Sequence, residues 1–128
     1  MTEIYFVRHA HAHYSEDEYH RPLSAQGQRD TERVTNLLKH QRIDAVYASP
    51  YRRAIQTVEG IAHARHLPVQ TIDGLKERQL STGKLEDFHA AVLRVWHEPS
   101  FAWAGGESNQ QATARAIPSL RNIRLACL

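Results

Sequence analysis

The chain has 128 residues and carries 16 Lys and Arg against 14 Asp and Glu, which leaves a net charge of +2 at pH 7. A domain usually has about 100–200 residues, so this length predicts a single domain over 1–128, and the small net charge gives no case for a nucleic-acid partner. The single cysteine, Cys127, excludes intramolecular disulfides and zinc sites built from several cysteines.

The apolar segments are too short for a membrane protein. The longest strongly apolar run, 4–7, falls far below the ~20 residues that a membrane-spanning helix needs. Glu3 and Arg8 enclose this run, which does not fit the apolar region of a signal peptide. We therefore expect a cytoplasmic protein without a membrane partner.

Short apolar runs alternate with segments of helical periodicity along the chain. The first part of the chain predicts a buried strand over 3–7, a polar loop to Pro22 and a helix from the N-cap Ser24. Then follow a strand over 44–48, a helix over 51–66, a strand over 67–72 and a helix over 85–97. A last helix is predicted from Ser108, with Gln111 as its capping-box partner. Pro118 is expected to break that last helix. The alternation of strands and helices predicts an α/β fold with a mostly parallel sheet.

Chemically versatile side chains follow each of the three predicted strands. Arg8 and His9 follow the first strand, Arg53 opens the helix after the second strand, and Glu77 comes shortly after the third. In parallel sheets, ligands bind beyond the carboxyl ends of the strands. We therefore expect these four residues to converge at one edge of the sheet.

These side chains have the properties that phosphoryl transfer needs. Arginine guanidinium groups bind phosphate oxygens as planar forks, and the N-terminus of the helix after Ser49-Pro50 favours an anion. The imidazole of His9 is a candidate nucleophile toward phosphorus, and Glu77 is a candidate acid/base. Taken one at a time, each residue has a more ordinary interpretation, such as a surface ion pair or a solvated histidine. The prediction depends on their joint placement.

The histidines of the first loop allow a second interpretation. His9, His11 and His13 alternate along an extended segment, so their side chains would point the same way and resemble the ligands of a zinc hydrolase. Such a site needs further ligands at later strand ends, and Asp44 begins its strand rather than ending it. The zinc site is therefore the weaker alternative.

Five short motifs resemble those of the histidine phosphatase superfamily, the phosphoglycerate mutase-like proteins. They are, in chain order, Arg8-His9-Ala10, a Leu-Ser-x-x-Gly motif ending at Gly27, a Ser-Pro-x-x-Arg-Ala-x-x-Thr motif over 49–57, a Leu-x-Glu motif ending at Glu77, and a Gly-Gly-Glu-Ser motif over 105–108. Together they span nearly the whole chain, and the motif over 49–57 is the most specific of them.

The resemblance implies a three-layer α/β/α sandwich with a mostly parallel sheet and a function that needs no metal or organic cofactor. It implies that His9 is the nucleophile that becomes phosphorylated, that Arg8 and Arg53 bind the phosphate, and that Glu77 is the acid/base. Ser15 stands where relatives often place an asparagine that touches the phosphate, so we expect a weaker contact there. The implied activity is that of a phosphatase or mutase acting on a small phosphorylated substrate through a phosphohistidine.

The chain departs from the family pattern near its end. The second catalytic histidine, which relatives carry after a late strand and before a glycine, has no counterpart, so the domain is expected to be C-terminally truncated. Loss of that group predicts an enzyme slower by about 10²–10³, or alternatively a phosphate-binding remnant without turnover. A missing strand would also leave strand 3–7 with an open edge, which a homodimer or the tail over 123–128 would cover.

Overall fold

A computed structural model describes residues 1–127 of the chain. This part of the chain forms two compact units. The first comprises residues 1–76 with the C-terminal residues from Arg124, and the second comprises residues 77–123. The boundary between them follows the 3₁₀ turn η1 (Asp73–Leu75).

The sheet belongs to the first unit and is parallel, as the alternation of strands and helices predicts. Among the described residues it has two strands, β1 (Val46–Ala48) and β2 (Val69–Thr71), which pair from Val46 opposite Val69 onward. Helix α2 (Arg52–Ala64) connects the two strands. The predicted α/β class is therefore confirmed.

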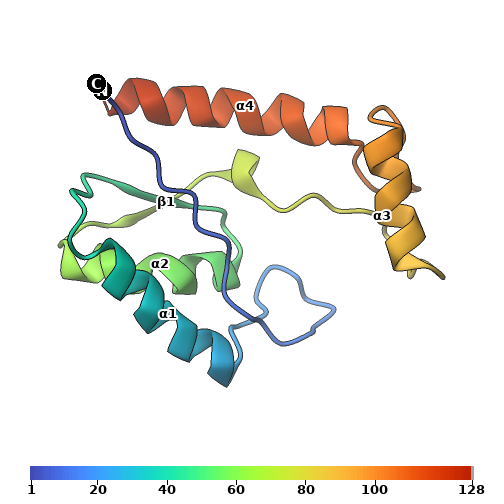
Figure 1. Cartoon of the computed structure of the whole chain (residues 1–128). Helices are drawn as coiled ribbons and strands as arrows, with labels where there is room; N and C mark the ends of the chain where they lie inside the picture. Colours follow the sequence, from blue (N-terminus) through green and yellow to red (C-terminus); the bar gives the residue numbers. More distant parts are fainter. Residues whose placement is uncertain (128) are drawn as a thin grey trace. The chain divides into compact units, whose positions relative to one another are not determined.

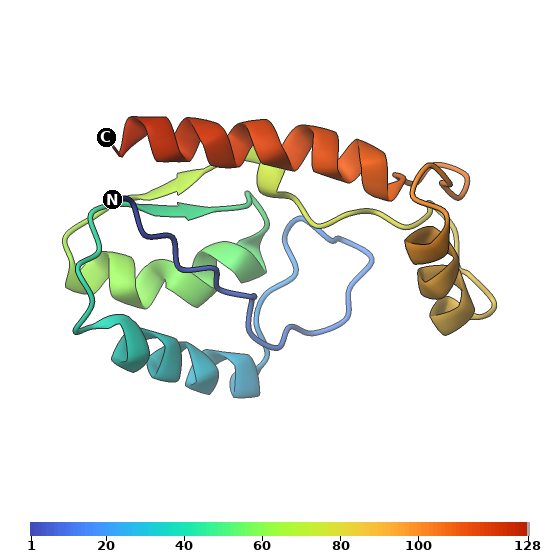
Figure 2. The same cartoon turned by 45° about the horizontal axis from the view of Figure 1, so that its top comes forward.

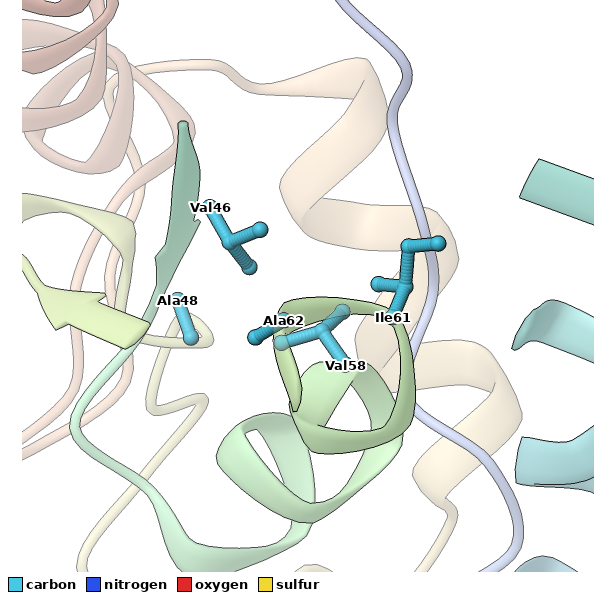
Figure 3. Close-up of a cluster of buried hydrophobic side chains, with 5 residues drawn as sticks. All are labelled: Val46, Ala48, Val58, Ile61 and Ala62. Carbon is cyan, nitrogen blue, oxygen red and sulfur yellow. The ribbon is translucent and has the colours of Figure 1, made fainter. Parts of the chain in front are cut away.

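Helix α2 packs its apolar face against the sheet. Its Val58, Ile61 and Ala62 side chains join Val46 and Ala48 of β1 in one buried cluster (Figure 3). Removal of apolar surface from water contributes roughly 25 cal/mol per Å², so this contact is a principal source of stability in the unit. Because α2 starts just after β1, the packing also places the first turn of α2 beyond the carboxyl end of that strand.

Helix α1 (Ala25–Leu38) begins at the predicted cap, where the Ser24 hydroxyl accepts the N–H of Gly27 at 3.1 Å. It lies alongside α2 in both Figure 1 and Figure 2. A glycine makes the approach possible, since a Cβ at Gly60 of α2 would collide with the hydroxyl of Thr35 on α1. The predicted helix and its cap are confirmed.

The apolar run over 3–7 is not a strand. In the described part of the chain it pairs with neither β1 nor β2, and Ile4, Tyr5, Phe6 and Val7 are each at least 36% exposed. The buried strand predicted there is wrong, because β propensity produces a strand only where a neighbouring strand takes up its backbone hydrogen bonds. The run is instead an exposed apolar surface.

Two helices belong wholly or largely to the second unit. Helix α3 (Phe88–His97) begins at the cap Asp87, whose side chain accepts the N–H of the third helical residue, rather than at 85 as predicted. Helix α4 (Asn109–Ala126) begins with the predicted capping box. The Ser108 N–H donates to the Gln111 side chain at 2.8 Å, and the Gln111 N–H donates to the Ser108 hydroxyl at 3.1 Å.

Helix α4 continues through Pro118 to Ala126. The break expected at Pro118 and a tail strand over 123–127 are therefore wrong, while Leu128 lies outside the described residues. Proline has a helical φ, but it lacks the N–H donor and disfavours the helical conformation of the residue before it, so α4 continues through Pro118 at a cost in stability. Although α4 has 18 residues, neither it nor any other helix in the described part of the chain is apolar and long enough to cross a membrane.

A substitution at Gly27 tests the packing of α1 against the first loop. A Cβ at Gly27 would overlap the carbonyl oxygen of His11, so we expect Gly27→Ala to lower the free energy of unfolding by about 1–3 kcal/mol. Gly83→Ala is the matched control, since a Cβ at Gly83 meets no atom within 4 Å. Urea unfolding compares the two variants, and equal stabilities would contradict the close approach.

Candidate active site

A cleft of about 450 Å³ opens beside the Arg-His motif in the first unit. It is lined by Arg8, His9, Ala10, His11, Ala12, Arg21 and Asp30. The lining combines two guanidinium groups and two imidazoles with one carboxylate. Such a set suits an anionic ligand.

The ring of His9 is oriented by the backbone next to it. Its Nδ1 lies 2.7 Å from the carbonyl oxygen of Ala10. A carbonyl accepts and does not donate, so Nδ1 carries the proton in this hydrogen bond, and the neutral tautomer has its lone pair on Nε2. A nitrogen lone pair is what attack on phosphorus requires, and the geometry is compatible with a nucleophilic His9.

Thr57 of α2 attaches the Arg-His motif to the helix that carries Arg53. Its hydroxyl accepts the N–H of Ala10 at 3.0 Å and donates to the carbonyl of Arg53 at 2.7 Å. Thr57 is 1% exposed, and its bond to Arg53 is buried while its bond to Ala10 is partly buried. Hydrogen bonds are stronger away from water. The structure thus joins the motif and α2 through one buried hydroxyl.

The segment after His9 is held against the start of α1. Ala12 and Leu23 form an antiparallel bridge, and the His11 carbonyl accepts the N–H of Ser24 at 2.9 Å. The Nδ1 of His11 lies 2.7 Å from the Ser24 hydroxyl. Ser24 therefore caps α1 and also holds in place the segment after His9, which lines the cleft.

Arg53 is buried and is engaged by the loop over 14–21. Its Nη2 forms an ion pair with Oε2 of Glu18 at 3.1 Å, and its Nη1 donates to the Glu18 carbonyl at 2.8 Å. Its guanidinium carbon lies 4.6 Å from the ring centre of Tyr51, a cation–π distance. A phosphate that binds Arg53 through this edge must therefore replace the carboxylate of Glu18.

The same loop covers the N-terminus of α2. The N–H of Arg52 donates to the Tyr19 carbonyl at 3.0 Å, so part of the anion-binding capacity expected at this helix end is already used. Ser15 lies in the loop, where its hydroxyl accepts the N–H of Asp17 at 3.1 Å. A phosphate contact of Ser15 stays a prediction.

A turn within the loop is stabilised by Asp17 and His20. The backbone N–H of His20 donates to the Asp17 carboxylate at 3.1 Å, and the His20 ring nitrogen lies 3.0 Å from it. These hydrogen bonds, the backbone one foremost, lower the pKa of the Asp17 carboxyl. Because the pKa is lowered in the folded chain, the contact stabilises the turn above the ordinary pKa of aspartate and is lost as the pH falls through the lowered value.

Glu77 follows η1, begins the second unit and is exposed. The segment after it runs beside the Gly-Gly-Glu-Ser motif. The Glu107 N–H donates to the Gln79 carbonyl at 2.9 Å, and a Cβ at Gly106 would collide with the carbonyl oxygen of Leu80. The motif therefore determines the path of the chain just beyond Glu77.

The Glu107 carboxylate is fixed by helix α4. Nε and Nη2 of Arg115 donate to its two oxygens at 2.7 and 2.8 Å, the fork geometry of a strong charge-assisted pair. This hydrogen bonding is the main reason why the pKa of Glu107 is lowered. The pair consequently stabilises the second unit above the ordinary pKa of glutamate, and that contribution is lost in acid.

The residues that could bind a metal do not gather. Among residues 1–127, no three His, Cys, Asp or Glu side chains lie close enough to hold a metal ion. His9 and His11 both line the cleft, but their Nδ1 atoms contact Ala10 and Ser24. This arrangement gives no support to the zinc site considered from the sequence.

Sequence reasoning did not single out Arg21, Glu18 or Thr57, although each takes part in the site. Thr57 ends the motif over 49–57, and Arg21 lies two residues before the Leu-Ser-x-x-Gly motif, so their positions were a usable signal. Glu18 had no such signal, because its contact with Arg53 depends on the path of the loop.

Comparisons with known proteins agree on one family. The model of the histidine phosphatase superfamily (branch 1) matches residues 4–127. The phosphatase PhoE of Bacillus subtilis, described as uncharacterized, is 31% identical over an alignment of 131 positions, which covers 98% of this chain and 66% of PhoE. GpmB of Proteus mirabilis, described as a probable phosphoglycerate mutase, is 32% identical over 108 residues, which cover 80% of this chain and 48% of GpmB.

A solved structure shows the same fold. The mycobacterial glucosyl-3-phosphoglycerate phosphatase with inorganic phosphate superimposes with a TM-score of 0.78 at 20% identity, over 91% of this chain and 60% of that one. At this identity the likeness concerns the fold, which is phosphoglycerate mutase-like as the motifs implied. The chain spans 48% to 66% of the lengths of these three proteins.

Replacement of Thr57 tests the attachment of the Arg-His motif to α2. We expect Thr57→Val to lower the free energy of unfolding by about 1–3 kcal/mol, because the partly buried N–H of Ala10 loses its acceptor and the carbonyl of Arg53 loses a buried donor. The matched control is Thr31→Val on α1, whose hydroxyl donates to the Gln28 carbonyl at 2.6 Å and whose loss should cost at most about 0.5 kcal/mol. Guanidinium unfolding followed by circular dichroism measures both, and equal effects would contradict the role of Thr57.

Proposed function

The chain belongs to the histidine phosphatase superfamily, and from this membership we propose that it transfers the phosphoryl group of a small phosphomonoester through a phosphohistidine at His9. The observation that carries the proposal is the cleft that Arg8 and His9 line together, with the His9 Nδ1 hydrogen-bonded to Ala10. The names of the relatives, a phosphatase and a phosphoglycerate mutase, support transfer either to water or to a second hydroxyl group.

The proposed reaction has two steps and needs no metal or organic cofactor. In the first, Nε2 of His9 forms a bond to phosphorus while the bond from phosphorus to the leaving oxygen breaks. Arg8 and Arg53 stabilise the charge on the phosphoryl oxygens, and Glu77 donates a proton to the leaving oxygen. In the second, Glu77 takes a proton from water, which attacks the phosphohistidine, releases phosphate and restores His9.

Mass spectrometry of the phosphorylated chain tests the covalent step directly. After incubation of the purified chain with p-nitrophenyl phosphate and quenching in alkali, we expect one added phosphoryl group, located at residue 9. His9→Ala should abolish the label, because the nucleophile is removed. His13→Ala is the matched control, since His13 is an exposed histidine of the same segment. It should be labelled like the original chain.

The labelling result also separates an enzyme from a phosphate-binding protein. A label that persists in His9→Ala would contradict the assignment of the nucleophile. A chain that binds vanadate but never acquires a label would indicate a phosphate-binding remnant without turnover, the alternative considered from the sequence.

We propose a second copy of the chain as a further partner, because the apolar run over 3–7 is exposed. Association that buries such a run is driven by the removal of apolar surface from water. Light scattering should give twice the 14.6 kDa of one chain, and Phe6→Ser, which replaces a side chain that is 76% exposed, should shift the population toward the monomer. A monomer at all concentrations of the unsubstituted chain would contradict the dimer.

A further inference from the structure

One carboxylate oxygen lies between two guanidinium groups of the first unit. Oε2 of Glu18 is 3.1 Å from Nη2 of Arg53 and 3.6 Å from Nη2 of Arg21. The side chains of Arg53 and Arg21 are 1% and 17% exposed, whereas that of Glu18 is 53% exposed. Arg53 is thus buried and Arg21 is partly buried, while the anion between them comes from a solvated loop.

Arg21 also belongs to the cleft of the candidate site, which it lines together with Arg8 and His9. Its Nε is buried and has no hydrogen-bond partner among the residues that the structure describes. Buried N–H donors are nearly always paired, because a donor removed from water without an acceptor is costly. An acceptor oxygen brought by a ligand would therefore stabilise this side chain.

A phosphate group fits the two arginines better than a glutamate does. Each guanidinium fork binds two phosphate oxygens at once, and phosphate brings more negative charge and more acceptors than one carboxylate. A buried guanidinium needs an anion beside it, so the Glu18 carboxylate can leave Arg53 only when another anion takes its place. Because the Glu18 side chain is half-exposed, it can turn into solvent when a phosphate does so.

We propose that Arg21 is a further phosphate-binding residue of the cleft, and that the Glu18 carboxylate occupies the position of a phosphate oxygen until the substrate replaces it. This inference rests on the proposed function, because it adds Arg21 to the same phosphate site as Arg8 and His9. Without phosphate, Glu18 neutralises the two arginines and holds its loop in place. With phosphate, the carboxylate is released to solvent.

Titration of the full chain with orthovanadate, followed by calorimetry, tests both parts of the proposal. Arg21→Gln should raise the vanadate Kd by roughly tenfold or more, because a charge-assisted hydrogen bond is lost. Glu18→Gln should lower the Kd by roughly two- to fivefold, because a competing anion is removed. The matched controls are Arg42→Gln and Glu59→Gln, which change exposed side chains and should leave the Kd unchanged.

The opposite directions of the two effects separate binding from folding. A purely structural role of the Glu18–Arg21 contact would lower the unfolding temperature of both variants and could not make vanadate bind more tightly to Glu18→Gln. An unchanged vanadate Kd in Arg21→Gln, or weaker vanadate binding in Glu18→Gln, overturns this inference. If Arg8→Gln, measured beside them, binds vanadate more weakly than the unsubstituted chain, the proposed function stays intact. If the unsubstituted chain binds no vanadate, or Arg8→Gln binds it equally well, the proposed function itself fails and this inference fails with it.

Discussion

The hydroxyl of Thr57 joins two parts of the candidate site that are far apart in the sequence. It accepts the N–H of Ala10 in a partly buried hydrogen bond and donates to the carbonyl of Arg53 in a buried one. The position of Thr57 is in turn set by the packing of α2 on β1, in which the adjacent Val58 takes part. The placement of His9, next to Ala10, therefore depends on the hydrophobic core.

Buried positive charge is the second constraint on the first unit. A guanidinium group withdrawn from water needs an anion or several acceptors close by. Arg53 obtains them from Glu18, through both the carboxylate and the backbone carbonyl, and Tyr51 adds its ring. The same arginine that suits a phosphate thus organises the loop over 14–21 on α2 when no phosphate is present. The positive charge of Arg53 therefore contributes both to the stability of the loop over 14–21 and to the affinity for an anion.

The second unit shows how small residues can determine the position of a distant functional group. Gly106 lets the chain approach Leu80 more closely than any side chain would allow, and Arg115 holds the neighbouring Glu107 from helix α4. Together these contacts direct the segment that begins at Glu77. A motif that carries no reactive group of its own in the proposed chemistry therefore supports the residue proposed as acid/base.

The sequence by itself determined the features that depend on neighbours along the chain. The cap at Ser24, the capping box that starts α4 and the apolar face of α2 follow from hydrogen bonds and periodicity within a few residues, as do the places of the two strand segments along the chain. The motifs likewise indicated the family, because they preserve residue types at short spacings.

Only the tertiary structure decided what depends on distant partners. The run over 3–7 has the composition of a strand, but a strand needs another strand to accept its hydrogen bonds, and the composition of the run says nothing about that partner. Arg53 meets Glu18 across 35 positions of the sequence, through a loop whose path no local pattern encodes. Local conformational preference is a property of a segment, whereas strand pairing and the burial of charge are properties of the assembled chain. For that reason the sequence identified Arg53, and the structure identified Glu18 as its anion.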